Sequence, residues 1–396
     1  MKHITPDTNV KPTNAAQRIC HQEDLAGHST AHAPGVLLSQ RSWILVLATL
    51  LCLCFFSTAT LADPSRKNCL NRVNYSQKKL LECITQDGLR IHAKELQKIA
   101  SRNRNRGYRA SGYPGYNASV WYVVRVLRNA GYRVVLQKVK FDDLVGFNVI
   151  AELPKGNSHN VIMLGAHLDS VFDGPGLNDN GSGSVALLEL ALMTRTLSPR
   201  NRVRYAWWAF EEVGLIGSAE YLINLTDREL NDIVLQIGPD MMGSPNAIRW
   251  IETFDPDDPG TDNHVLIKHR NALSQLFRKK FKEILGFEAS TAAEQPFLLD
   301  YVGCGYTDYC NFLEFGIPAM DGIFTGTLFE EPSVSEAERF GVTANEPADP
   351  CYHQACDTIH NIDFRVLEEN TDVTAAVLLE LMFDRKIRAF NFTKDK

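Results

Sequence analysis

The sequence predicts a single α/β domain in which helices cover both faces of a mostly parallel central sheet. Apolar runs of strand length alternate along the chain with longer segments of helical spacing, which is typical of this architecture. Charged residues follow the ends of three successive apolar runs. Because open α/β sheets bind ligands at the carboxyl ends of their strands, the same pattern also indicates where a site should form.

Composition is compatible with a large globular core and argues against one class of partner. The chain has 396 residues, 44% of them hydrophobic, and a formal net charge of -6. No break in composition separates two domains. Basic residues form only short clusters, at 102–106 and 278–280, which are typical of a solvated surface. We therefore expect no nucleic-acid partner.

The amino end is expected to lie outside the fold. Residues 1–40 are polar and without period, and we interpret them as a leader of unclear role. Residues 41–62 begin with a basic residue, continue as an apolar run and end in small residues, which predicts a signal peptide cleaved near Ala62. The apolar run is short for a membrane span, and a retained anchor is the alternative.

The remaining chain, 63–396, is expected to be one exported domain, either secreted or periplasmic, without membrane contact after signal cleavage. Residues 63–80 are either a propeptide or an N-terminal extension of that domain. We expect the protein to be a monomer.

Cysteine usage supports export. Of nine cysteines, the six beyond the predicted signal fall into close pairs along the chain. An even number in close pairs after a signal predicts disulfides. The expected pairs are Cys69–Cys83, Cys304–Cys310 and Cys351–Cys356. A cysteine metal site is the alternative, but the pairs lack the Cys-x-x-Cys spacing that is typical of zinc.

The first elements are identified from the spacing of apolar residues. Residues 74–100 have helical spacing, and residues 119–130 resume it until Gly131 ends the helix. Two strands follow. Residues 133–139 alternate between apolar and polar side chains, and residues 148–153 form a short apolar run.

The central elements are apolar runs that polar residues follow. Strands are expected at 161–164, 203–210 and 233–237, alternating with helices at 185–197 and 218–225. The first of these strands should carry a histidine just beyond its end.

The last third is less regular. Residues 248–264 are acidic and predicted to be irregular, and residues 265–285 have the spacing of a long amphipathic helix. The sequence then predicts a short helix, a strand, a long polar loop and a closing helix, at 307–315, 319–324, 326–350 and 364–383.

Two imidazoles and four carboxylates are expected to converge at the ends of these strands. They are His167, Asp179, Glu211, Glu212, Asp240 and His353. Carboxylates in one cleft repel one another unless a cation or a proton is shared among them. Zinc accepts both histidine nitrogen and carboxylate oxygen. Five ligands with one of them bridging suit a pair of metal ions about 3.5–4 Å apart.

Each residue also has a structural interpretation. A histidine after a strand is often structural, and an aspartate such as Asp179 in Asn-Asp-Asn-Gly can simply make a turn. Glu211 and Glu212 can be a solvated pair, Asp240 can cap a turn, and His353 can lie on the surface. Their joint placement at strand ends favours the metal hypothesis.

The chain resembles the M28 family of zinc aminopeptidases, in particular the secreted bacterial single-domain type. The resemblance covers residues 80–385 and depends on several segments that occur in the same order. These segments are RASGYPGYNAS at 109–119, AHLDSV at 166–171, GPGLNDNGSG at 174–183, WAFEEVGLIGS at 208–218, PDMMGSPN at 239–246, TDYCNFLEFGIP at 307–318 and CYHQACDTIHNID at 351–363. The resemblance implies a zinc-exopeptidase fold and makes 63–396 the catalytic aminopeptidase domain.

The resemblance also implies the ligand of each metal. His167 binds one zinc ion, and Asp179 bridges both ions. Glu212 is a ligand, Asp240 is a ligand on the other metal, and one histidine is the last ligand. That histidine is His353, because its spacing to the following Asp-Thr fits the family, whereas that of His360 does not.

Further roles follow from the same resemblance. Glu211 is the general base, Asp169 orients the imidazole of His167, and Tyr352 pairs with the substrate oxyanion. A disulfide between Cys351 and Cys356 stiffens the loop around His353.

The implied enzyme is a dinuclear zinc aminopeptidase that hydrolyses the N-terminal peptide bond of peptides or proteins, with a metal-bridging water as nucleophile. One alternative is a glutaminyl-peptide cyclase, which shares the fold and several ligands but uses a single zinc ion. The other is a non-enzymatic binding module on the same fold.

Overall fold

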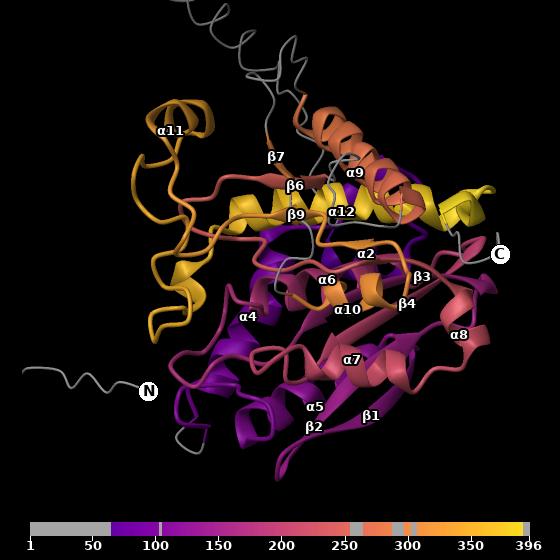
Figure 1. Ribbon diagram of the computed structural model, residues 1–396, viewed down its shortest axis with the longest axis horizontal. Coiled ribbons are helices and arrows are strands. Elements are labelled where there is room, and N and C mark those ends of the chain that lie inside the picture. Colours follow the sequence, from indigo (N-terminus) through magenta and orange to yellow (C-terminus); the bar gives the residue numbers. More distant parts are fainter. Residues whose placement is uncertain (1–64, 103–104, 254–263, 287–296, 302–306, 391–396) are drawn as a thin grey trace, which may run out of the picture. The chain divides into compact units, whose positions relative to one another are not determined.

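A computed structural model describes residues 65–102, 105–253, 264–286, 297–301 and 307–390 (Figure 1). The predicted leader, signal peptide and Cys304 lie outside the described residues. Within the described part of the chain, no helix is both long and apolar enough to cross a membrane.

The central sheet has six strands in the order β1-β2-β4-β3-β5-β8. Their bounds are β1 Arg133–Phe141, β2 Leu144–Glu152, β3 Asn157–His167, β4 Asn201–Trp208, β5 Ile233–Ile237 and β8 Ala319–Met320. The hairpin of β1 and β2 joins the sheet antiparallel at one edge, and β4, β3, β5 and β8 run parallel. The prediction of a mostly parallel α/β sheet is therefore confirmed.

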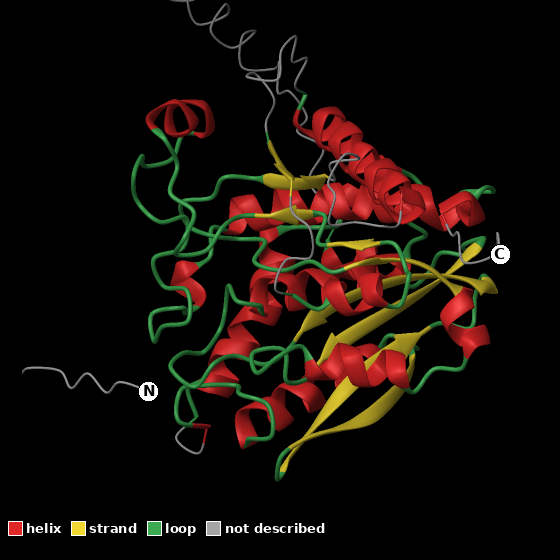
Figure 2. Cartoon of the chain, viewed as in Figure 1, coloured by secondary structure: helices red, strands yellow, loops and turns green. Residues whose placement is uncertain are grey.

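Helices cover both faces of this sheet, as Figure 2 shows for the layers of helix and strand. One face contacts α5 (Pro114–Asn129), α6 (Gly181–Thr194) and α12 (Phe364–Phe383), with α4 (Gln86–Ala100) packed on them. The other face contacts α7 (Ile216–Ile223), α8 (Asp227–Asp232) and α10 (Tyr309–Glu314).

Two hydrophobic cores lie on the two faces, and neighbouring residues of one strand alternate between them. Trp207 of β4 belongs to the larger core and Trp208 to the smaller one. Leu164 and Met163 of β3 divide in the same way. Since successive strand side chains point to opposite faces, a strand buried on both faces has an uninterrupted apolar sequence.

A second sheet was not predicted. It has three strands in the order β7-β6-β9, namely β7 Leu298–Tyr301, β6 Trp250–Thr253 and β9 Ile323–Phe324. Helix α9 (His264–Leu285) contacts β6 and α12. The expectation that 248–264 is irregular is wrong where β6 forms.

The predicted single strand at 319–324 is also wrong, because β8 and β9 belong to different sheets. Gly322 lies between them with φ +94°, a left-handed conformation that glycine adopts at no steric cost. Met320 therefore pairs with β5, whereas Ile323 pairs with β6.

Other boundaries differ from expectation. The predicted loop 326–350 contains α11 (Val334–Phe340), whose Ser333 and Glu336 form a reciprocal capping box. Helix α5 begins at Pro114, earlier than expected, with proline in its first turn. His167 is the last residue of β3 rather than a residue beyond it. Short 3₁₀ helices, η3 (Ile359–Asn361) and η4 (Ile387–Phe390), flank α12.

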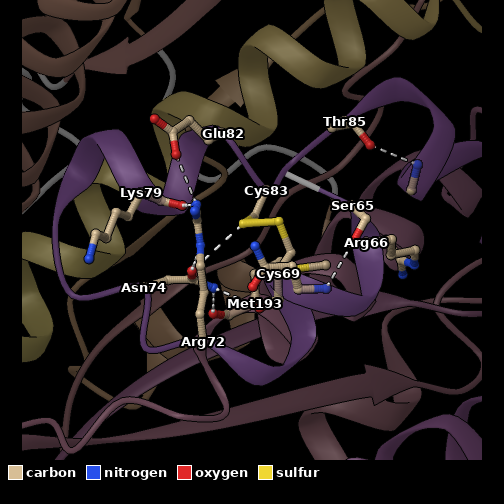
Figure 3. Close-up of a disulfide and its surroundings, with 12 residues drawn as sticks. Ser65, Arg66, Cys69, Arg72, Asn74, Lys79, Glu82, Cys83, Thr85 and Met193 are labelled. Carbon is tan, nitrogen blue, oxygen red and sulfur yellow. Dashed lines mark hydrogen bonds and ion pairs between the residues drawn. A yellow bond between two sulfur atoms is a disulfide. The ribbon is translucent and has the colours of Figure 1, made fainter. Parts of the chain in front are cut away.

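The first described segment makes polar contacts with helix α6 of the domain. It comprises α2 (Arg66–Asn71) and α3 (Gln77–Leu81), and the Cys69–Cys83 disulfide closes it (Figure 3). The Asn74 amide donates to the carbonyl oxygen of Met193 in α6 at 2.8 Å. The Arg66 guanidinium pairs with the buried carboxylate of Glu189 in the same helix. The Cys351–Cys356 disulfide is present as well.

Candidate metal centre

Three adjacent parallel strands deliver polar side chains to one edge of the sheet. His167 ends β3, Glu211 and Glu212 follow β4, and Asp240 follows β5 after a Gly-Pro step. Because β3 lies between β4 and β5, the residues that follow the three strands lie next to one another at this edge.

The loop carrying Asp179 is held against the loop carrying Asp240. Asn180 caps α6 by accepting from the Gly183 amide at 2.9 Å, and its side-chain amide donates to the Pro239 carbonyl oxygen at 2.9 Å. A Cβ at Gly183 would lie 2.2 Å from that same oxygen, so only glycine permits this approach.

The first cluster comprises His167, Asp179 and Asp240. Nε2 of His167 lies 3.2 Å from Oδ1 of Asp179 and 3.5 Å from Oδ2 of Asp240. All three side chains are buried, and one ligand atom from each lies within 4.8 Å of the others. Such atoms are close enough to share one cation.

The second cluster comprises Asp179, Glu212 and His353. Nε2 of His353 lies 3.0 Å from Oδ2 of Asp179 and 3.1 Å from Oε2 of Glu212. Asp179 therefore presents one carboxylate oxygen to each cluster. His360 is exposed and belongs to neither cluster.

Several buried atoms of these residues are left without hydrogen bonds among the described residues. They are both ring nitrogens of His167, Oε1 of Glu212 and Oδ1 of Asp240. Buried polar atoms normally have a partner, and imidazole nitrogen with carboxylate oxygen is a donor set that zinc accepts. The residues present therefore fit a metal pair.

Electrostatics give the same picture of excess negative charge. Burial and the charge of Asp179 raise the pKa of Glu212 to about 7. Burial lowers the pKa of His353, but its bonds to Asp179 and Glu212 raise it to about 10. Burial opposes ionisation of Asp179, yet the neighbouring imidazoles of His167 and His353 hold its pKa below the usual range. Cations bound here would offset the negative charge of these carboxylates.

Glu211 lies beside the clusters without belonging to either. Its Oε2 is 3.7 Å from Nε2 of His167. Burial, together with the charges of Asp308 and Asp240, raises the pKa of Glu211 well above its ordinary value. Asp169 lies 3.6 Å from Nδ1 of His167, which is ion-pair distance, and accepts from the Glu211 amide at 3.4 Å.

Two buried side chains that received no role in the sequence analysis support the loops. Arg109 donates to the carbonyl oxygens of Leu168, Pro175 and Gly176. Asp357 accepts from the backbone amides of Asn178 and Asp179. Sequence motifs contain both residues, but nothing local to either indicates these contacts.

Left-handed backbone conformations occur beside the site residues. Phe210, Met241 and His353 have φ of 56°, 46° and 57°. Such conformations cost free energy in residues other than glycine, and they concentrate where a functional arrangement requires them.

The two clusters open into a cavity of about 600 Å³. Tyr352 lines this cavity, and its ring stacks on that of His353 at 3.9 Å between centroids.

Sequence reasoning missed four polar residues near the clusters, namely Thr307, Asp308, Glu252 and Asp321. Thr307 donates to Oδ2 of Asp240 at 2.9 Å, and Asp308 accepts from the Ser218 hydroxyl.

The chain is similar in sequence to known peptidases. The model of peptidase family M28 matches residues 148–378. Leupeptin-inactivating enzyme 1 of Streptomyces exfoliatus is 36% identical over 295 residues, covering 74% of this chain and 61% of that protein. An aminopeptidase of Pseudomonas aeruginosa is 40% identical over 241 residues, covering 61% of this chain and 42% of that protein. The chain thus spans about three-fifths or less of these relatives' length.

Solved structures show the same fold. The aminopeptidase from Aneurinibacillus sp. strain AM-1 aligns with a TM-score of 0.57 at 17% identity, over 78% of this chain and 96% of that one. A glutaminyl cyclase from Porphyromonas gingivalis aligns with a TM-score of 0.56 at 18% identity, over 74% and 98%. At these identities the likeness concerns the fold alone.

Proposed function

Because the chain belongs to peptidase family M28, we propose that it is an exported dinuclear zinc aminopeptidase that hydrolyses the N-terminal peptide bond of peptides and proteins. The observation that carries the proposal is the position of Asp179. Its two carboxylate oxygens lie 3.2 Å from His167 and 3.0 Å from His353, which belong to different clusters.

The proposed ligands follow from the two clusters. His167 and Asp240 would hold one ion, Glu212 and His353 the other, and Asp179 would bridge them. Zinc ions bound there supply Lewis acidity and lower the pKa of water towards neutrality.

Glu211 is the proposed general base. It is buried beside both clusters and remains outside them, so its carboxylate is available for proton transfer. Glu211 accepts a proton from the attacking water and delivers it to the leaving amine. Asp169 keeps the His167 ring oriented from its Nδ1 side.

Tyr352 is proposed to stabilise the oxyanion. Burial and the charge of Asp179 raise the pKa of its phenol, so the hydroxyl keeps its proton at neutral pH. A neutral phenol in the cavity donates a hydrogen bond to the oxygen on which negative charge develops.

Export is supported by the disulfides Cys69–Cys83 and Cys351–Cys356, which are typical of oxidising compartments. We propose that residues 41–62 are the signal peptide, that 63–396 form the catalytic domain, and that the protein acts as a monomer without membrane contact.

The test combines activity with metal content. Purified protein is assayed on aminoacyl-p-nitroanilides before and after chelation, and zinc is counted by mass spectrometry. We expect activity that chelation abolishes and zinc restores, with two zinc ions per chain. Asp240→Ala and His353→Ala should each retain about one ion, because each removes a ligand from a different cluster.

The same assay includes a peptide beginning with glutamine. Cyclisation of this peptide by a protein holding one zinc ion would replace our proposal with a glutaminyl cyclase. Stable protein that turns over neither kind of substrate would indicate a binding module.

A further inference from the structure

Three carboxylates that the proposed metal centre does not use line the cavity, and one of them, Glu330, already accepts from the amide and hydroxyl of Thr327. Glu252 of β6 and Asp321, which lies between β8 and β9, line the same cavity as Asp179 and Glu212. Both side chains are buried, with 4% and 7% of their surface exposed. The second sheet thus provides an acidic wall next to the metal clusters.

The two acidic residues are held together. The Asp321 amide donates to Oε2 of Glu252 at 2.8 Å. Oδ1 of Asp321 is buried and has no hydrogen-bond partner among the described residues. Asp321 lines the cavity, and a buried carboxylate oxygen without a donor is costly unless a ligand supplies one.

A buried cation, Arg270, lies near this pair. Arg270 interacts electrostatically with Glu252 and Asp321, and its Nε donates to the Ala319 carbonyl oxygen at 3.0 Å. Burial lowers the pKa of Arg270 to about 10, so the guanidinium stays charged at neutral pH. Burial and the charge of Glu252 raise the pKa of Asp321 well above its ordinary value, so a cation bound beside Asp321 would replace the proton on its carboxylate.

Apolar side chains form part of the remaining cavity wall. Leu215, Met241, Phe324 and Phe329 line it together with the acidic pair. Apolar side chains beside a carboxylate suit a ligand side chain with an aliphatic stem and a cationic head, as in lysine and arginine. An uncharged leucine or phenylalanine side chain would leave Oδ1 of Asp321 desolvated and unpaired.

A third metal ion is less compatible with these contacts. Glu252 and Asp321 belong to no cluster of three or more metal-ligating atoms among the described side chains. An organic cation needs fewer carboxylates than a metal ion and can donate hydrogen bonds to Oδ1 of Asp321 directly.

We propose that Asp321, together with Glu252, forms the base of a specificity pocket for the cationic side chain of an N-terminal lysine or arginine. This inference rests on the proposed aminopeptidase function. It assigns the substrate class of that activity, and Asp321 selects the side chain without taking part in bond cleavage.

The experiment compares substrates of matched shape on the full, zinc-loaded protein. The kcat/KM values are measured for p-nitroanilides of lysine and norleucine, and for those of arginine and citrulline. We expect the charged member of each pair to be favoured by about tenfold or more, because each forms a charge-assisted bond with a buried carboxylate.

Variants then assign the preference to the acidic wall. Asp321→Asn should reduce the lysine-to-norleucine ratio to within about threefold of unity, and Asp321→Glu should restore part of it. Asp372→Asn is the matched control, because Asp372 is a partly buried acid on α12 that does not line the cavity. Its ratio should equal that of the unmodified protein. Thermal melts check the folding of each variant.

The outcomes separate the two proposals. Hydrolysis of norleucine and citrulline substrates at rates equal to or above those of their charged partners would overturn the pocket and leave the aminopeptidase intact. A ratio that survives Asp321→Asn would overturn the role of Asp321. The absence of hydrolysis for every anilide on zinc-loaded protein would overturn the aminopeptidase itself. If Asp321→Asn does not fold, the kcat/KM ratios of the substrate pairs on the unmodified protein still test whether the pocket prefers a cationic side chain.

Discussion

The Asp357 carboxylate accepts a hydrogen bond from the backbone amide of Asp179, with 3.1 Å between Oδ2 and nitrogen. Its other oxygen accepts from the Asn178 amide at 2.8 Å. Asp357 is buried and follows His353 by four residues. The segment carrying His353 therefore positions the loop that carries Asp179.

This contact predicts a loss of metal affinity when Asp357 is removed. Asp357→Ala should weaken zinc binding by about 10–100-fold, because groups that orient metal ligands have effects of that size. Competition with a chromophoric chelator measures the affinity. His360→Ala is the control, since His360 is exposed nearby and outside both clusters. Equal zinc affinities in the two variants would contradict the role of Asp357 in positioning the Asp179 loop.

The adjacent glutamates should have separable roles. Glu211→Gln should keep its zinc and lose turnover by about 10²–10⁴-fold, because it removes only proton transfer. Glu212→Gln should lose zinc from the second cluster as well as activity. Zinc content and kcat are measured on both variants. Retained activity in Glu211→Gln would exclude this residue as the base.

The N-terminal segment should contribute to stability through its disulfide. The Cys69–Cys83 bond closes a loop with a sequence separation of 14. Replacing both cysteines with serine should lower the free energy of unfolding by about 3 kcal/mol, which is typical of a loop of this length. Urea denaturation measures the change. An unchanged midpoint would indicate that residues 65–84 fold independently of the domain, as a removable propeptide would.

One acid away from the clusters should make stability depend on pH. Burial and the charges of Glu368 and Glu369 raise the pKa of Asp372 to about 8. An aspartate in the unfolded chain has a pKa of about 4. The raised pKa of Asp372 therefore stabilises the folded protein fully below that pH, and this stabilisation is lost as the pH rises towards 8. Asp372→Asn should therefore lose less stability than the unmodified protein between pH 5 and 8, measured by urea denaturation. Parallel pH profiles would contradict this assignment.

Sequence reasoning recovered the elements whose signal is local. Helix α12 occurs over the predicted 364–383. It was recognisable because apolar residues recur with helical spacing along the whole segment. The strands β3, β4 and β5 were recognisable because burial on both faces removes polar residues from their interiors.

The elements that were missed are short or defined by distant partners. Strand β6 has only four residues and becomes a strand by pairing with β7 and β9. Helix α11 was predictable in principle, since Ser333 and Glu336 form a capping box, but its polar composition resembled a loop.

The same division applies to the site. Residues at the ends of predicted strands, such as His167 and Asp240, could be grouped from the chain alone. Glu252 and Asp321 could not, because the second sheet that brings them to the cavity depends on pairing between segments about 70 residues apart.

The bridging position of Asp179 is tested most directly by anomalous diffraction at the zinc edge from crystals of the zinc-loaded protein. We predict two peaks about 3.5–4 Å apart. One should lie within bonding distance of His167 and Asp240, the other within bonding distance of Glu212 and His353, and the Asp179 carboxylate should contact both. A single peak, or two peaks of which one does not contact Asp179, would contradict the dinuclear centre.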